Sequence, residues 1–330
     1  MSIRYIAQHE IDRSKWDRCI AEASNGSIYA YSMYLDHMSP RWDGLVLDDY
    51  DAVMPLTWNR KWGILYLYQP YLSAEGGVFQ REAVETEILR AFLEAIPRKF
   101  RFWEFALNSE NLLPDTGFPL YPRMNFLLPL NSAYETIRQG YRKDLKNNLQ
   151  KAGEANLSYA MDIPVDWVIH LAEKQLSALT KLKREHYKHF EKLYRRLHDD
   201  KMAQTRGVVN QEGKLLASGV FLFSHTRAYY VLAGNHPEGR EVGASHMLLD
   251  GFIREHAGSG LTFDFEGSDI PSLAMFYRGF GAYEQPYAAI RLNRMPGPLR
   301  WLKHAERPRQ ELSRPIFEYS FRQEHVHRPR

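Results

Sequence analysis

Residues 233–252 read AGNHPEGREVGASHMLLDGF, and the interpretation of the fold starts from this segment. It continues an apolar run over residues 227–234, typical of a buried strand, and leads into a helical pattern from about 243 to 257. Gly239 and Gly243 give the connection a flexible backbone. A strand that passes through such a loop into a helix directs free backbone N–H groups outward, which is how phosphate is often bound. An ordinary helix entry after a turn is the alternative.

The elements on either side of this junction form a repeated order. The strands 203–209, 214–224 and 227–234, separated by the turns NQEG and SHT, predict an antiparallel meander. The helix 243–257, the strand 261–265, a helix over about 270–279 and a closing strand near 287–292 follow it. The first half shows the same succession, in this order: strands 44–48, 52–58 and 63–69, a helix over 81–96, and strands 101–107 and 118–130.

Helices also open both halves. A helix over residues 12–22 begins the first half, and a long helix over about 133–152 begins the second, because Tyr134, Tyr141 and Ala152 belong to one apolar stripe of helical spacing. A strand near 157–161 and two amphipathic helices, around 165–179 and 187–197, come next.

Composition places the chain among soluble globular proteins. It has 330 residues, of which 44% are hydrophobic and 25% charged. The length suggests two domains, residues 1–130 and 131–295, followed by a tail over 296–330 that holds 8 Lys+Arg and 4 Asp+Glu. Because the net charge of +3 resides in the tail, a dedicated duplex-binding protein is disfavoured.

Location and standard motifs narrow the function further. The lone Cys19, the absence of a secretory signal and the lack of a long apolar run predict a cytoplasmic protein with no membrane span. No nucleophile elbow, P-loop or dinucleotide fingerprint occurs, which disfavours serine hydrolases, kinases and dehydrogenases. His186, His189, His325 and His327 lack the partners of a metal site, so no metal is predicted.

Three segments resemble a known family. REVGAS, residues 240–245, resembles the pyrophosphate loop of the GNAT superfamily of acetyltransferases, with Ser245 where Gly or Ala is usual. FDFEGSDIPSLAMFYRGFGA, residues 263–282, is similar to the ending of tandem-GNAT acyltransferases of the Fem-type and BioF2-like group. YRKDLKNNLQKA, residues 141–152, is similar to the basic segment that often opens their second domain.

The resemblance implies an α/β (α+β) fold of two GNAT-like domains, each a mixed central sheet flanked by helices. It implies transfer of an acyl or aminoacyl group to an amine, with acyl-CoA or aminoacyl-tRNA as donor; the two donors stay open. It places the donor's phosphates at the loop, in the second domain, and the pantetheine between the strands 227–234 and 261–265. The loop residues are Arg240, Val242, Gly243, Ala244 and Ser245.

Two residues near the end of this segment are candidates for proton transfer. Glu266 follows an apolar strand directly and would take the proton from the attacking amine. Alternatively, Glu266 or Asp264 caps the next helix or pairs with a cation. Tyr277 would protonate the leaving thiolate, although Phe276 and Tyr277 together are also typical of plain packing against a sheet.

Two further segments bear on substrates. The basic segments 138–151 and 181–196 would form one continuous surface beside the anion loop if the donor were tRNA, but need not if it were CoA. The aromatic stripe of the second segment is better explained as core. The segment 27–42, with Tyr29, Tyr34 and Trp42, is expected to be a loop that either grips the acceptor or packs between domains.

The leading interpretation is therefore a cytoplasmic N-acyltransferase that acts on a small-molecule or peptide amine. The alternative is a catalytically inactive protein of the same fold that binds a ligand or partner without chemistry. Thermal stabilisation distinguishes the two, because an acyl-CoA should stabilise the protein more than free phosphate does if a pantetheine channel exists. No shift with any acyl-CoA or charged tRNA would favour the binding protein.

Overall fold

The computed structural model describes residues 2–176, 182–267 and 269–295. By internal contacts these residues divide into two compact units, one made of residues 2–124 and 286–295 and the other of residues 125–285. The domain roles predicted for residues 1–130, 131–295 and 296–330 stay predictions. The tail, with His325 and His327, lies outside the described residues.

The first unit is built on a mostly antiparallel sheet. Its strands are β1 (Ile3–Ile6), β2 (Trp42–Leu47), β3 (Ala52–Lys61), β4 (Ile64–Tyr68), β5 (Phe79–Gln80) and β6 (Phe100–Ala106). Their order is β1-β2-β3-β4-β6, with β5 on β3 and a parallel pair only at β4–β6. The helices are α1 (Arg13–Glu22), α2 (Ser32–Met38) and α3 (Thr86–Ala95), with short 3-10 turns η1 (Gln8–Glu10), η2 (Ile28–Ala30) and η3 (Ser109–Asn111).

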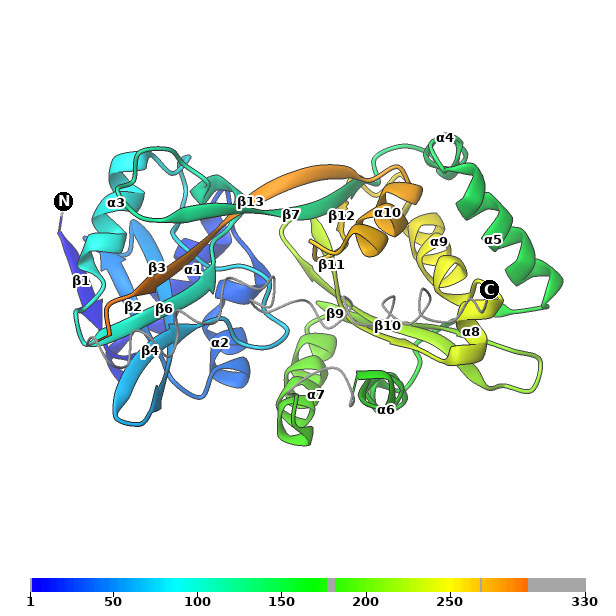
Figure 1. The fold of residues 1–330 in the computed structure, drawn as a ribbon, viewed down its shortest axis with the longest axis horizontal. Coiled ribbons are helices and arrows are strands. Elements are labelled where there is room, and N and C mark those ends of the chain that lie inside the picture. The colour runs from blue at the N-terminus through cyan, green and yellow to red at the C-terminus, as the bar shows by residue number, and fades with distance from the viewer. Residues whose placement is uncertain (1, 177–181, 268, 296–330) are drawn as a thin grey trace, which may run out of the picture. The chain divides into compact units, whose positions relative to one another are not determined.

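Helices cover both faces of this sheet (Figure 1). On one face α1 contributes Trp16, which packs beside Trp42 and Val53. On the other face α3 contributes Phe92 to a second apolar cluster that includes Trp103. All five side chains are buried, so the alternating pattern of the strands is explained by two separate cores.

The expected aromatic loop over residues 27–42 is wrong. The segment contains η2 and α2, and it buries Tyr29, Tyr34 and Trp42 at 2% exposure or less. Sequence reasoning missed α2 because its seven residues are too short to show a clear period. These aromatic side chains belong to the interior of the first unit.

The second unit contains the strand–loop–helix junction of residues 233–252. Its strands are β7 (Leu120–Pro129), β8 (Ser158–Met161), β9 (Ala203–Val209), β10 (Leu215–Ser224), β11 (Arg227–Asn235) and β12 (Thr262–Asp264). Its helices are α4 (Tyr134–Gln139), α5 (Lys143–Glu154), α6 (Val165–Leu176), α7 (Arg184–Asp199), α8 (Pro237–Glu241), α9 (Ala244–His256) and α10 (Pro271–Gly279). The strand order is β8-β9-β10-β11-β12-β7, so the predicted meander β9-β10-β11 is confirmed.

The closing strands differ from the expected arrangement. The strand expected to close the first half, β7, pairs through Leu127–Pro129 with β12 of the second unit. The last strand, β13 (Tyr283–Asn293), pairs through residues 289–293 with β6 of the first unit. Each strand runs out of one unit into the other, an exchange that the repeated element order does not predict.

The single helix expected over residues 133–152 is also wrong, because it is divided into α4 and α5. Gly140 ends α4, and Arg142 has an extended backbone with φ −66° and ψ 155°. That break allows the amide of Arg142 to donate to the carbonyl of Gly279 at 2.9 Å. The apolar stripe continues across the break, so periodicity alone did not reveal it.

Helices lie on both faces of the second unit's sheet (Figure 1). α6 and α7 pack on one face, and α9 packs on the other. Phe252 of α9 stacks on Phe221 of β10 with ring centroids 3.9 Å apart, which anchors α9 to the sheet. The predicted α/β class, with mixed sheets flanked by helices, is confirmed. Within the described residues, no helix is both long and apolar enough to span a membrane.

Candidate functional site

The predicted anion loop lies between β11 and α9. Arg240 lies in the short helix α8, and Val242 follows it. Gly243 then turns the chain with φ +76°, a left-handed conformation that favours glycine. A β-carbon at this position would also overlap the carbonyl oxygen of Asn148 in α5. Gly243 is therefore required both by the turn and by the close approach of α5.

The first turn of α9 begins with two buried residues, Ala244 and Ser245, which are 0% and 9% exposed. Among the described residues, the amides of Ala244 and Ser245 have no hydrogen-bond acceptor, as is usual for the first turn of a helix. The hydroxyl of Ser245 donates to Oδ1 of Asn235, and the amide of Asn235 donates to Oε1 of Gln175 at 2.6 Å. Asn235 thus holds the start of α9, the end of β11 and α6 together.

Beyond their first residues, β11 and β12 separate. Their parallel pairing covers three residue pairs, from Arg227 with Thr262 to Tyr229 with Asp264. β11 then continues for six residues to Asn235, whereas the next amide after β12, that of Phe265, donates to the carbonyl of Phe126 in β7. The pairing with β7 therefore continues past the point at which the pairing with β11 ends. In the described part of the chain, no strand pairs with this edge of β11 beyond Tyr229.

Asp264, the last residue of β12, is buried within a hydrogen-bond network. Its carboxylate accepts from Nδ2 of Asn125 at 3.0 Å, from Nη1 of Arg227 at 3.1 Å and from the amide of Glu266 at 2.8 Å. Burial raises the pKa of this carboxyl, and the charge of Arg227 opposes the rise. Asp264 therefore pairs with a cation, Arg227, which is one of the alternatives that the sequence left open.

Glu266 lies directly beyond this network in an unusual conformation. Its φ is +66°, in the left-handed region, and its side chain is buried. A non-glycine residue held there stores backbone strain, which occurs preferentially at functional sites. Neither Glu266 nor Asp264 caps α10, whose N-cap is Ile270 with no side-chain hydrogen bond.

Tyr277 lies on the sheet side of α10 and is only 1% exposed. Its ring packs against Phe265, with centroids 4.7 Å apart, and against Phe126. The neighbouring Phe276 meets His246 edge-on at 4.9 Å. These contacts bring the helix of the predicted acid to the end of β12 and to the start of α9. The packing expected for the aromatic pair is present, and the chemical role of Tyr277 stays a prediction.

Sequence reasoning missed His246, Asn125 and Arg227. His246 lies in the first turn of α9, and its Nδ1 is buried with no hydrogen-bond partner in the described structure. Burial lowers its pKa to about 4, so the imidazole is neutral at physiological pH. A histidine one residue after the anion loop was the only available signal. Asn125 gave none, because 139 residues separate it from Asp264.

Comparison with known proteins identifies the fold. Residues 138–271 match the family model described as an acetyltransferase (GNAT) domain. The structure titled FemX is 14% identical, with a TM-score of 0.61, covering 92% of this chain and 99% of that one. The chain has the tandem GNAT fold of the Fem type. The sequence matches no curated protein.

Two other solved structures are similar over most of their length. The C-terminal domain of a putative lysylphosphatidylglycerol synthetase from Agrobacterium fabrum is 12% identical, with a TM-score of 0.56, covering 91% of this chain and 96% of that one. A tandem GNAT protein from the clavulanic acid biosynthesis pathway is 11% identical, with a TM-score of 0.50, covering 90% of this chain and 100% of that one. Identities this low establish the GNAT fold alone.

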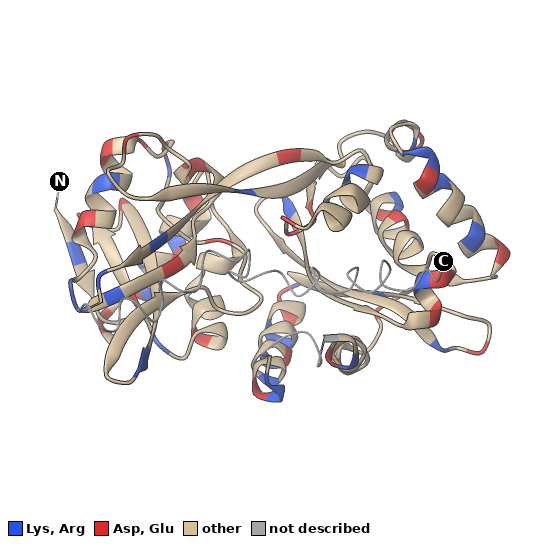
Figure 2. Ribbon diagram, viewed as in Figure 1, with Lys and Arg blue, Asp and Glu red and all other residues tan. Residues whose placement is uncertain are grey.

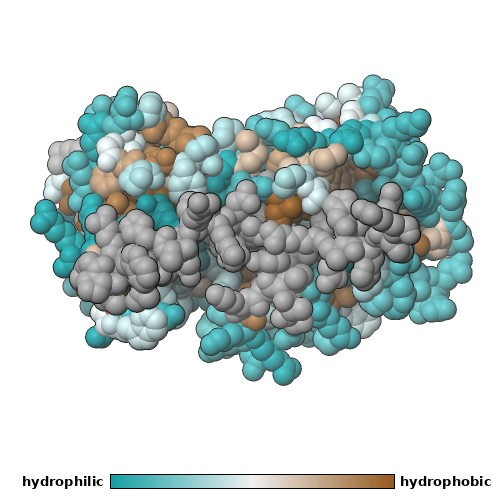
Figure 3. All heavy atoms as spheres, viewed as in Figure 1, coloured by the Kyte–Doolittle hydropathy of each residue, from teal (hydrophilic) through white to brown (hydrophobic). Residues whose placement is uncertain are grey.

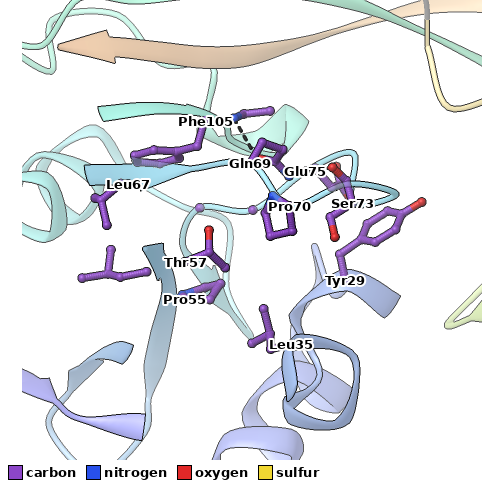
Figure 4. Close-up of a pocket in the computed structure, with 14 residues that line it drawn as sticks. Tyr29, Leu35, Pro55, Thr57, Leu67, Gln69, Pro70, Ser73, Glu75 and Phe105 are labelled. Carbon is purple, nitrogen blue, oxygen red and sulfur yellow. Dashed lines mark hydrogen bonds between the residues drawn. The ribbon is translucent and has the colours of Figure 1, made fainter. Parts of the chain in front are cut away.

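In the first GNAT unit, side chains fill the place that corresponds to the separation of β11 and β12. Its parallel strands β4 and β6 pair as far as Tyr68 and Glu104. Directly after β4, Oε1 of Gln69 accepts from the amide of Ala106 at 2.9 Å, bridging the strand ends (Figure 4). The remaining cavity, which Tyr29 and Phe105 help to line, measures about 20 Å³, space for about one water molecule.

The two basic helices of the second GNAT unit do not lie on one face. α5 packs on α9, whereas α7 packs on α6 and β9, on the other side of the sheet (Figure 1). Both carry several Lys and Arg residues (Figure 2). The stripe of Tyr187, Phe190 and Tyr194 on α7 is buried, which confirms its prediction as core. The continuous basic surface expected for a tRNA donor is therefore not formed by α5 and α7.

An open groove of about 770 Å³ lies between α4, α5 and α9. Arg138, Lys146 and Arg254 line it together with the acids Glu135 and Asp250. The side chains over α4 and α5 are hydrophilic on the face drawn in Figure 3. Because charges of both signs line this groove, it does not favour a polyanion such as RNA.

Proposed function

We propose that the protein is an N-acyltransferase that moves an acyl group from acyl-CoA to an amine, with its donor site in the second GNAT unit. The observation that carries this proposal is the separation of β11 from β12 beyond Tyr229, which leads to the free amides of Ala244 and Ser245. The open edge of β11, from Tyr230 to Asn235, is about 17 Å long at a strand rise of ~3.4 Å per residue.

The residues present fit a pantetheine and a pyrophosphate. An open strand edge offers backbone groups that pair with the amides of an extended ligand as another strand would. The first-turn amides and the dipole of α9 attract a phosphate, and Arg240 and Val242 precede them. When bound, acyl-CoA supplies a thioester carbonyl for attack by the amine.

Glu266 is proposed as the general base. An amine attacks only as the neutral nitrogen, so its proton must pass to a carboxylate, directly or through one water molecule, as the new C–N bond forms. Tyr277 is proposed to give a proton to the sulfur as the C–S bond breaks. Burial of both side chains would limit competing attack by water.

Acyl-CoA is proposed as donor in preference to aminoacyl-tRNA. Support comes from α5 and α7, whose positive charge lies on opposite faces of the sheet, and from the mixed charges of the groove beside α9. The acceptor is proposed to be an amine on a small molecule or a peptide. The first unit, whose strand-end corner is filled by Gln69, would serve the acceptor or only support the second unit.

Thermal unfolding with each donor tests the proposal. Acetyl-CoA and longer acyl-CoAs should raise the melting temperature more than phosphate or pyrophosphate does, because selective binding to the native state stabilises it by about 2.7 kcal/mol at a hundredfold excess over Kd. A larger shift with aminoacyl-tRNA would transfer the proposal to that donor. A shift with acyl-CoA but no thiol release with any amine would favour the inactive binding protein, and no shift at all would contradict the site.

A further inference from the structure

The tip of the β3–β4 hairpin exposes a tryptophan. Trp62 is 81% exposed, more than any other large hydrophobic side chain in the described residues. Trp62 and Gly63 have φ of +50° and +79°, the sign pattern of a type I′ turn, in which asparagine followed by glycine is preferred. A bulky residue at positive φ is unfavourable, and asparagine would avoid that cost at this position. The turn itself therefore does not require the indole, and its surroundings decide whether it has a role.

Cations surround this tip because strand ends meet there. Leu65 of β4 pairs with Phe100 of β6, and Asn293 of β13 pairs with Phe102. The amide of Arg294 donates to the carbonyl of Arg101 at 2.8 Å. The three segments that meet at this edge, residues 59–65, 97–102 and 291–295, contain no Asp or Glu. They hold seven cationic residues: Arg60, Lys61, Arg98, Lys99, Arg101, Arg291 and Arg294.

Most of these cations are available for a ligand. Arg291 lies near Glu104, and Lys99 donates to the hydroxyl of Tyr5. The other five are exposed and have no acidic partner within the described ranges. With Trp62 they form what we call the basic edge: Arg60, Lys61, Trp62, Arg98, Arg101 and Arg294. Figure 2 shows this concentration of Lys and Arg at the β3–β4 hairpin and the adjoining strand ends.

We propose that the basic edge docks the protein on an anionic phospholipid surface, with Trp62 entering the headgroup region. Neighbouring strand ends lie about 4.8 Å apart along one side of a sheet, so a plane of negative charge meets several of the cations at once. Tryptophan favours the membrane interface, where its ring is half in an apolar and half in a polar environment. Lys61 Nζ lies 4.7 Å from the ring centroid, which keeps a cation beside it.

A single-stranded nucleic acid fits the edge less well. Such ligands are held by several aromatic side chains that stack successive bases along a positively charged groove. The hairpin tip offers one exposed ring on a protruding turn. The docking proposal is independent of the acyl transfer proposed above, because it uses residues of the first unit alone.

Vesicle co-sedimentation with the full chain tests the docking. Vesicles of phosphatidylcholine alone are compared with vesicles holding about one third phosphatidylglycerol. The variants are Trp62→Asn, which suits the type I′ turn, and the pair Arg60→Gln with Lys61→Gln. The control is Trp167→Gln on α6, where an indole that is 56% exposed lies in the other unit. Because every variant retains residues 296–330, binding by the basic tail is the same in all of them.

The proposal predicts binding to the phosphatidylglycerol vesicles and little to phosphatidylcholine alone. Each cation removed should weaken binding about fivefold, Trp62→Asn should weaken it at least as much, and Trp167→Gln should leave it unchanged. Trp62 emission should shift to the blue on binding in wild type. Equal binding by wild type and Trp62→Asn, or no preference for the anionic vesicles, would overturn the proposal. The proposal would also be overturned if the same variants lost binding to an oligoribonucleotide but still bound the vesicles.

Discussion

The carboxylate of Asp264 accepts a hydrogen bond from the backbone amide of Glu266 at 2.8 Å. This bond joins the buried end of β12 to the residue proposed as general base, and it spans the turn in which Glu266 has positive φ. The same carboxylate is bound by Asn125 and Arg227. In the proposed mechanism Asp264 would therefore be a positioning residue, because it holds the backbone of Glu266.

Asp264→Asn should destabilise the protein by about 1–3 kcal/mol, because the buried carboxylate accepts from Asn125, Arg227 and the amide of Glu266, and an amide group cannot accept from all three donors. Denaturant unfolding measures this change. Asp166→Asn is the matched control, since it removes a carboxylate that pairs with Arg195 at the surface, where both side chains are more than half exposed. The control should cost less than about 1 kcal/mol. Equal costs for the two variants would contradict the structural role of Asp264.

Gly243→Ala should cost more stability than Gly213→Ala. Both glycines have φ +76°, so alanine meets the same backbone strain of about 1–3 kcal/mol at each. Only Gly243 also faces a backbone atom, the carbonyl oxygen of Asn148, whereas Gly213 has open space around it. The difference between the two melting temperatures therefore isolates the contact of the loop with α5. Indistinguishable melting temperatures would show that this contact does not constrain the loop.

His246 should make stability depend on pH between about 6.5 and 4. Burial lowers its pKa to about 4 in the folded protein, while Asp144 and Lys151 of α5 act on it with opposite signs. The unfolded chain binds a proton as the pH falls below about 6.5 and the folded protein does not, so stability falls over this range by at most about 3 kcal/mol.

The variant His246→Gln tests this titration, because it removes the group and retains a polar side chain. As the pH falls from about 6.5 to about 4, the wild type should lose up to about 3 kcal/mol more unfolding free energy than the variant. His186 and His256, whose pKa values burial also lowers, are present in both proteins and cancel in the comparison. Parallel pH profiles would contradict the burial of His246.

Glu266→Gln should lower the rate of acyl transfer by about 10²–10⁴-fold, the usual contribution of a general base, without loss of acyl-CoA binding. Tyr277→Phe should lower the rate less, because a thiolate is a good leaving group without a proton. Steady-state thiol release with a reactive primary amine measures both. An unchanged rate for Glu266→Gln would remove Glu266 from the mechanism.

Much of the fold was predictable because it depends on local pattern. The meander β9–β11, the junction at Gly243 and the helix opened by Pro271 all have short-range signals, namely alternation, glycine and proline. The exchange of β7 and β13 had none, since both strands show the same apolar pattern whichever sheet they join. The break after Gly140 allows the amide of Arg142 to bond the carbonyl of Gly279, the last residue of α10, and that partner is 137 residues away in the sequence.

The candidate site divides in the same way. Arg240 to Ser245 occupy one local loop, so the motif was sufficient to locate them. The environment of Glu266 depends on Asn125 and Arg227, which come from two other strands, so only the tertiary structure reveals it. Trp62 was not singled out because a lone tryptophan beside glycine gives no signal until its exposure is known.

The measurement that tests the donor site most directly is calorimetric titration of acetyl-CoA into wild type and Ser245→Asp. A carboxylate in the first turn of α9 repels a pyrophosphate from the amides of Ala244 and Ser245 but suits the helix dipole. Because the change also removes the hydrogen bond that Ser245 donates to Asn235, the melting temperature of the variant without ligand is measured first, to show that the fold is retained. Ser259→Asp, in an exposed turn after α9, is the control. The account predicts saturable binding to wild type and to Ser259→Asp and at least tenfold weaker binding to Ser245→Asp. Equal affinity in all three proteins would place the donor elsewhere.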